Sequence, residues 1–114
     1  IMPYINVQTN VTVTPAQADA LKTRLGKDIA AIPGKSESWL MVSISGGQAM
    51  YFQGSAAPCA MADISIFGHA SAEAFEKLTQ AVTASLKAEL NLEPARIYTK
   101  YSEVENWGWN GGNF

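Results

Sequence analysis

One residue near the start of this chain could do chemistry: a proline, if the methionine before it is removed. The sequence opens IMPYINV, so Pro3 directly follows Met2. An initiator methionine that precedes a small residue such as proline is normally removed, and we expect residues 1–2 to be a non-native or removed extension. Pro3 would then carry a free secondary amine, and an α-amino group ordinarily has a pKa of about 7.7–8.0. A free prolyl nitrogen could therefore accept a proton at neutral pH.

The other residue types that commonly carry chemistry are scarce and isolated. Cys59 is the single cysteine and His69 the single histidine of the chain. One cysteine excludes an internal disulfide, and the two residues form no cluster with metal-ligand spacing. We therefore expect no metal and no other cofactor, and we interpret Cys59 as a small buried hydrophobic residue.

Length and charge exclude several classes of protein. A chain of 114 residues fits one domain over residues 1–114, and its net charge of −2 gives no attraction to nucleic acid or to an anionic membrane. No apolar run approaches the roughly 20 residues that span a bilayer, and no signal-peptide pattern is present. We expect a cytoplasmic protein with no nucleic-acid or membrane partner, and leaderless secretion remains an open alternative.

The first half of the chain reads as strand, helix and strand. Residues 3–11, PYINVQTNV, alternate apolar and polar side chains as a half-buried strand does. Thr14 is the expected N-cap of a helix, with Pro15 in the first turn and Gln17 as the capping-box partner. Residues 39–45, WLMVSIS, alternate again and predict a second strand. The apolar stripe of the helix comprises Ala18, Leu21, Leu25, Ile29 and Ile32, and PGK at residues 33–35 ends it.

The second half repeats this plan. Residues 46–58 are rich in turn formers and predict a loop or short hairpin. An alternating strand follows over 59–67, Ser71 is the expected N-cap of a second helix, and a last strand covers 96–101. The helix carries Phe75, Leu78, Val82, Leu86 and Leu90 at steps of three and four.

Two such β-α-β units predict an α+β fold, a four-stranded sheet with two antiparallel helices on one face. The other face would carry Tyr4, Met41 and Met61, which favours cover by another subunit. The tail NWGWNGGNF is too rich in glycine for a helix, yet it holds three aromatic residues. We expect these aromatic residues to dock, on a neighbouring subunit in our interpretation.

Five short motifs in this order resemble the macrophage migration inhibitory factor and D-dopachrome tautomerase family. They are Pro3, GK at 34–35, PCA at 58–60, RIYTKY at 96–101 and GWN at 108–110. The resemblance covers essentially the whole chain. It implies the duplicated β-α-β fold, a homotrimer whose sheets close into a barrel, and an active site at each subunit interface.

The activity that the resemblance implies is keto-enol tautomerisation of phenylpyruvate-like α-keto acids. Pro3 would be the catalytic base, because burial disfavours its charged form and moves its pKa towards the working pH. Lys35 matches the lysine that holds the substrate carboxylate, and Tyr98 matches a tyrosine contributed by the neighbouring subunit. With two residues ahead of Pro3, the chain should be inactive or weak.

The resemblance also implies the lining of the pocket. Ile66 and Phe67 stand at the family position whose backbone and side chain line it, and Trp109 and Phe114 match its aromatic rim. Lys100 stands where the family often has Asn, Phe67 where it often has Ile, and Trp39 where an aromatic Tyr is common. A second cation at Lys100 would lower the Pro3 pKa or bind the carboxylate. These departures leave the preferred substrate open.

Two other functional interpretations stand beside the enzyme. One is a cytokine-like binding protein that docks to a protein receptor with an inherited, weakly active pocket, and the other is a structural trimer with a vestigial one. Each site residue also has a structural interpretation: Pro3 opens a strand, Lys35 caps a helix end, and Tyr98 packs in a sheet.

Overall fold

Alternating side chains build a four-stranded sheet in the computed structural model, which describes residues 2–114. The strands are β1 (Pro3–Thr9), β2 (Met41–Ser45), β3 (Ala60–Phe67) and β4 (Ile97–Val104). Their order is β2-β1-β3-β4. The pairs β1–β2 and β3–β4 are parallel, whereas β1 and β3 run antiparallel down the middle. The predicted duplicated β-α-β architecture is therefore confirmed.

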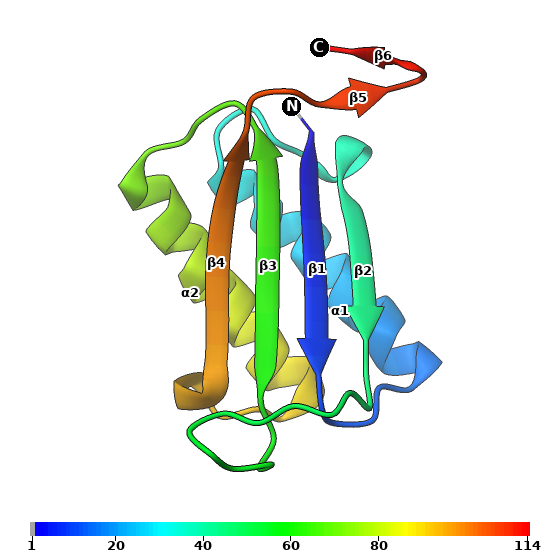
Figure 1. Cartoon of the computed structure of the whole chain (residues 1–114), viewed down its shortest axis with the longest axis vertical. Coiled ribbons are helices and arrows are strands. Elements are labelled where there is room, and N and C mark those ends of the chain that lie inside the picture. The colour runs from blue at the N-terminus through cyan, green and yellow to red at the C-terminus, as the bar shows by residue number, and fades with distance from the viewer. Residues whose placement is uncertain (1) are drawn as a thin grey trace.

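Two helices cover one face of this sheet, as Figure 1 shows: α1 (Pro15–Asp28) and α2 (Ala72–Leu90). The Thr14 hydroxyl accepts from the Gln17 amide at 3.1 Å, and the Gln17 side chain accepts from the Thr14 amide at 2.9 Å. Ser71 accepts from the Ala74 amide at 3.1 Å. Both predicted N-caps are thus present, and each satisfies amide donors that the first turn leaves free.

Element ends differ from the sequence-based expectation where loops take over. Helix α1 ends at Asp28, and a 3-10 turn over Ile29–Ala31 replaces the predicted last turn. Ile32 is extended, with φ −89° and ψ 117°, because the proline that follows it disfavours the helical region. A second 3-10 turn, Glu37–Trp39, precedes β2 and shortens that strand at its start.

The hydrophobic core lies between the sheet and the helices. Ile5 and Ile64 reach it from the two central strands, and Leu21 and Leu78 reach it from the two helices. All four side chains are completely buried. Burying such a side chain stabilises the fold by roughly 1.5–3 kcal/mol. The core therefore fixes which face of each strand turns to the helices. The residues between the core residues of each strand point to the opposite face of the sheet.

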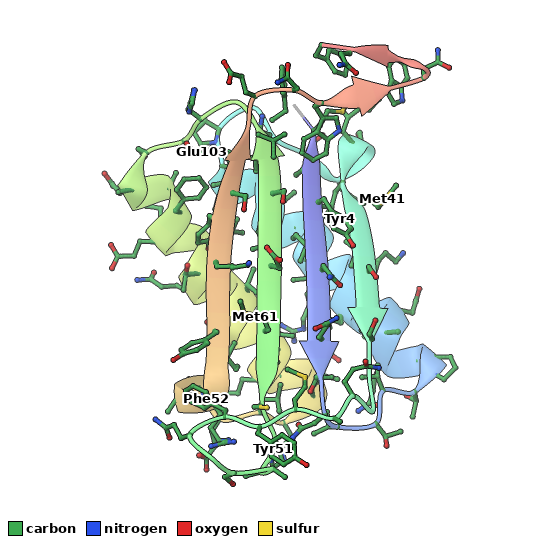
Figure 2. All side chains as sticks on the ribbon, in the orientation of Figure 1. Tyr4, Met41, Tyr51, Phe52, Met61 and Glu103 are labelled. Atoms are coloured by element: carbon green, nitrogen blue, oxygen red, sulfur yellow. The ribbon has the colours of Figure 1, made fainter. Side chains whose placement is uncertain are left out.

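The opposite face of the sheet has no helix over it. Figure 2 shows Tyr4, Met41 and Met61 on this face, as predicted. The Met41 side chain is 68% exposed. We call this the open face of the sheet. No helix within residues 2–114 is both long and apolar enough to cross a membrane.

The tail forms a hairpin across one end of the sheet (Figure 1), from β5 (Gly108–Trp109) to β6 (Gly112–Asn113). Asn110 and Gly111, both with positive φ (52° and 80°), form its two-residue turn. The tail's aromatic residues dock on the same chain, since the Trp109 ring lies 5.1 Å from that of Trp39. Trp109 is still 51% exposed, so docking of the tail on a neighbouring subunit stays a prediction.

Candidate functional site

A cavity of about 620 Å³ opens at the end of the sheet where β1 begins. The start of β1, the 3-10 turn before β2 and the tail hairpin form its walls. It is lined by Met2, Pro3, Tyr4, Ser38, Trp39, Leu40, Met41, Ser65, Val104, Trp107, Gly108 and Trp109. Aromatic and aliphatic side chains predominate, which suits a small ligand with an aromatic ring.

Pro3 lies on the wall of this cavity because it is the first residue of β1, a position that requires no ladder donor from it. It pairs with Ile66 of β3. The carbonyl of Met2 accepts from the Phe67 amide at 2.9 Å, and Met2 is only 4% exposed. In the Met2–Pro3 peptide bond the prolyl lone pair is delocalised into the carbonyl and accepts no proton.

Lys35 lies beside the C-terminal end of β3, the end that is next to Pro3. The chain reaches it through a turn at Gly34, whose φ of 80° a glycine adopts without steric cost. Its ammonium donates to the Phe67 carbonyl at 3.0 Å. An ammonium has three donors, so two remain for a ligand. Within residues 2–114 no carboxylate forms an ion pair with Lys35.

Four aromatic rings form a series from Lys35 to the cavity. The Phe67 ring lies 5.6 Å from that of Phe114, which lies 6.2 Å from the stacked ring of Trp109. Trp39 meets Trp109 edge to face at 5.1 Å. Each separation falls within the range at which aromatic pairs attract beyond simple burial. The structure therefore brings together Pro3, Lys35 and these rings at one end of the sheet.

The structure corrects the expectation that the side chain of Ile66 lines the pocket. Its side chain is 1% exposed and belongs to the hydrophobic core, so it does not line the pocket. The alternation of β3 explains this: Ile64 and Ile66 face the helices, while Ser65 and Phe67 face the other way. Only the backbone of Ile66 is near the cavity, through its pairing with Pro3.

Tyr98 and Lys100 lie farther along the sheet within the chain. Tyr98 pairs with Met61 at the end of β3 opposite to Pro3, five positions from Ile66. A strand rises about 3.3 Å per residue, which places the two ends about 17 Å apart. Lys100 pairs with Asp63, and its ammonium lies 3.5 Å from that carboxylate. One chain therefore does not assemble these two residues with Pro3.

The acid nearest to the site along β4 is engaged elsewhere. Glu103, which pairs with Ile66, accepts from the Ala70 amide at 3.0 Å and lies 3.4 Å from His69 Nδ1. The backbone hydrogen bond lowers the pKa of Glu103, and the neighbouring His69 adds to this effect. Among residues 2–114 no three His, Cys, Asp or Glu side chains gather closely enough to hold a metal ion.

Sequence reasoning did not place Met41, Ser65 and Trp107 in the site. Alternation over residues 39–45 gave the faces of the second strand, and it put Met41 opposite to the core. It could not show which loop covers that face. The tail hairpin makes the wall, and its position depends on the contact of Trp109 with Trp39, far apart in sequence.

Comparisons with known proteins agree over the whole described chain. The family model described as macrophage migration inhibitory factor (MIF) matches residues 2–114. The macrophage migration inhibitory factor of Xenopus laevis is 30% identical, with 99% of each chain covered. The crystal structure of Leishmania major MIF2 is 27% identical and superposes with a TM-score of 0.93 over 99% of this chain and 97% of that one. The Toxoplasma gondii macrophage migration inhibitory factor is 30% identical, with a TM-score of 0.87 over 97% and 99%.

Proposed function

Because this chain belongs to the macrophage migration inhibitory factor family, we propose that it is a tautomerase of aryl α-keto acids such as phenylpyruvate, with Pro3 as its base. The observation that carries the proposal is the position of Pro3 on the wall of an aromatic-lined cavity of about 620 Å³. The proposal concerns the form of the chain in which Pro3 is the first residue.

A free prolyl nitrogen suits this reaction for physical reasons. Its ring holds the lone pair in a fixed direction, and a partly apolar cavity disfavours the protonated amine, which lowers its pKa towards neutrality. The amine takes a proton from the carbon next to the keto group. It then returns that proton to the oxygen, which gives the enol, and the reverse transfers regenerate the ketone.

Lys35 is the proposed anchor for the substrate carboxylate. The hydrogen bond to the Phe67 carbonyl fixes the direction of the ammonium while leaving two donors. The aromatic ring of the substrate would lie among Trp39, Trp109 and Phe114, whose faces and edges are already in contact with one another. The carboxylate and the ring together would present the reactive carbon to Pro3.

The proposed assembly is a homotrimer whose active sites lie between subunits. Support comes from the open face of the sheet, on which Met41 and Tyr98 are exposed by 68% and 60%. Tyr98 and Lys100 would then serve the Pro3 cavity of a neighbouring subunit. Tyr98 would be a polar partner for the substrate there, and the Asp63 carboxylate would balance part of the Lys100 charge.

A receptor-binding role is the second candidate, and the names of the relatives favour it, since they are called macrophage migration inhibitory factors. Such a role would need the fold and the trimer but not turnover. The kinetic experiment below separates the two candidates.

The test compares three proteins for phenylpyruvate tautomerisation: the Pro3-first form, the form with residues 1–2, and a Pro3-first Pro3→Gly variant. We expect fast turnover in the first alone, because a positioned general base contributes about 10²- to 10⁴-fold. The longer form should be inactive or much weakened, since its prolyl nitrogen is an amide and Met2 fills part of the cavity wall. Equal, negligible rates in all three would reject the enzyme and favour the binding role.

A further inference from the structure

The long connection between β2 and β3, residues 46–59, is held to the fold by three polar side chains from outside it. The Thr9 hydroxyl donates to the Cys59 carbonyl at 2.7 Å, and the other two side chains make several hydrogen bonds each. One is Asn10, just after β1. Its amide nitrogen donates to the carbonyls of Ala56 and Ala57 at 3.0 and 3.1 Å, and its oxygen accepts from the Cys59 amide at 2.9 Å. Asn10 therefore fixes the second half of the connection.

The other is Arg96, just before β4. Its Nε donates to the Pro58 carbonyl at 2.9 Å, and its Nη2 lies 3.1–3.2 Å from the carbonyls of Phe52, Ser55 and Ala57. Within residues 2–114 no carboxylate forms an ion pair with this guanidinium. Carbonyl dipoles face its charge instead, in a geometry that the planar fork of arginine matches and lysine does not.

Arg96 also fixes the ring of Phe52. The guanidinium carbon lies 5.2 Å from the ring centroid, within cation–π distance. Phe52 and Ser55 exchange both backbone hydrogen bonds, at 2.9 and 3.0 Å, around a tight turn with positive φ at Gln53 and Gly54. The backbone and the ring of Phe52 are thus both held, although residues 46–59 contain no regular strand or helix.

The Phe52 ring in turn meets Tyr98. The two rings lie 4.8 Å apart at an angle of 75°, an edge-to-face pair. Tyr98 is otherwise exposed by 60% on the open face, where a tyrosine has several accessible side-chain orientations. Figure 2 shows Phe52 beside the start of β4, whereas its sequence neighbour Tyr51 lies farther out on the connection.

We infer that Arg96 and Phe52 are positioning residues, which hold the Tyr98 ring in the orientation that serves the active site. The inference rests on the proposed function, in which Tyr98 reaches the substrate from a neighbouring subunit. Arg96 organises residues 52–58, these residues present the Phe52 ring, and that ring limits the orientations of Tyr98. Phenylpyruvate would then meet a tyrosine that is already oriented.

The test is a double-mutant cycle on kcat/KM for phenylpyruvate in the Pro3-first protein. Phe52→Ala should lower kcat/KM by roughly 2- to 10-fold, the range expected for an edge-to-face pair. The same change in a Tyr98→Ala background should have almost no effect, because no ring remains to be oriented. Phe52→Tyr, which keeps a ring, should restore the rate, and Arg96→Lys should behave as Phe52→Ala does. Tyr51→Ala is the matched control and should leave kcat/KM unchanged, since Tyr51 is 75% exposed.

A second readout is independent of catalysis: the aromatic NMR resonance of Tyr98, which the Phe52 ring shifts. Phe52→Ala and Arg96→Lys should move this resonance in the same direction, and Tyr51→Ala should leave it in place. Equal losses of kcat/KM in both backgrounds, or an unmoved resonance in Arg96→Lys, would overturn the inference. A Pro3-first protein without any turnover would instead reject the proposed function, and the resonance would still decide whether Arg96 and Phe52 orient Tyr98.

Discussion

At the scale of single residues, the ammonium of Lys35 is the cation that the proposed substrate would meet. It is tied to one end of β3 by its hydrogen bond to the Phe67 carbonyl, at 3.0 Å. A cation held in this way can accept a carboxylate without reorganising, which keeps the entropic cost of binding low.

Replacing Lys35 tests this role. Lys35→Ala should lower kcat/KM for phenylpyruvate by about 10- to 100-fold, mainly through KM, because a hydrogen bond to a charged group contributes about 1.5–3 kcal/mol. Steady-state kinetics of the Pro3-first protein would measure it. Lys22→Ala is the control, since Lys22 is a half-exposed lysine of α1 that pairs with Asp19. An unchanged KM in Lys35→Ala would remove Lys35 from the binding site.

At the scale of elements, much of the fold follows from local sequence. The alternation of residues 3–11 predicted β1, and Thr14 and Ser71 predicted the starts of both helices, because cap hydrogen bonds join residues only three apart. Element ends that depend on distant contacts were less predictable. Strand β4 continues to Val104, past the predicted end at 101, since all of β3 is available to pair with it.

Part of the candidate site was likewise predictable from local sequence, and part was not. The proline, the lysine and the tail aromatic residues could be named from motifs, and the structure brings them to one end of the sheet. The tail hairpin was not predictable, because its place is decided by Trp39, about seventy positions away in the chain. The side chain of Ile66 was misassigned because a motif match does not say which face of a strand a residue takes.

A partly buried carboxylate lies between α1 and α2, and its burial disfavours the ionised form. Asp28 of α1 accepts from the Ser85 hydroxyl of α2 at 2.6 Å, and Ser85 is 3% exposed. Burial raises the pKa of Asp28 above its ordinary 3.8, although the Ser85 hydrogen bond and the charge of Arg24 oppose this. Since the folded state then binds the proton more tightly than the unfolded chain, stability falls as pH rises from about 3.8 through the folded-state pKa.

Asp28→Asn should remove this dependence while keeping an oxygen that accepts from Ser85. We expect the Tm of the variant to rise relative to that of the original protein as pH increases above 3.8, and the difference to level off beyond the folded-state pKa. Thermal unfolding over a pH series would measure it. Asp19→Asn, at an aspartate whose side chain is 77% exposed, is the control and should give no such trend. Parallel curves for Asp28→Asn and the original protein would contradict the prediction.

At the scale of the whole molecule, the residues proposed for the site lie at opposite ends of the sheet. Pro3 and Lys35 lie where β1 begins, and Tyr98 lies at the start of β4, about 17 Å away by strand rise. No single chain can bring these residues to one small substrate. If both take part, the substrate must lie between two copies, and the open face is the surface available for that contact.

Subunit mixing tests this arrangement directly. Pro3→Gly and Tyr98→Ala proteins, both Pro3-first, should each be weak alone. Co-refolded in equal amounts, they should recover about one quarter of the original activity, because in a random cyclic assembly about a quarter of the sites draw Pro3 from one parent and Tyr98 from the other. Mixing the same proteins without unfolding is the control and should recover nothing while the assemblies stay intact. A co-refolded mixture no better than the mean of its parents would show that Tyr98 does not act across a subunit boundary.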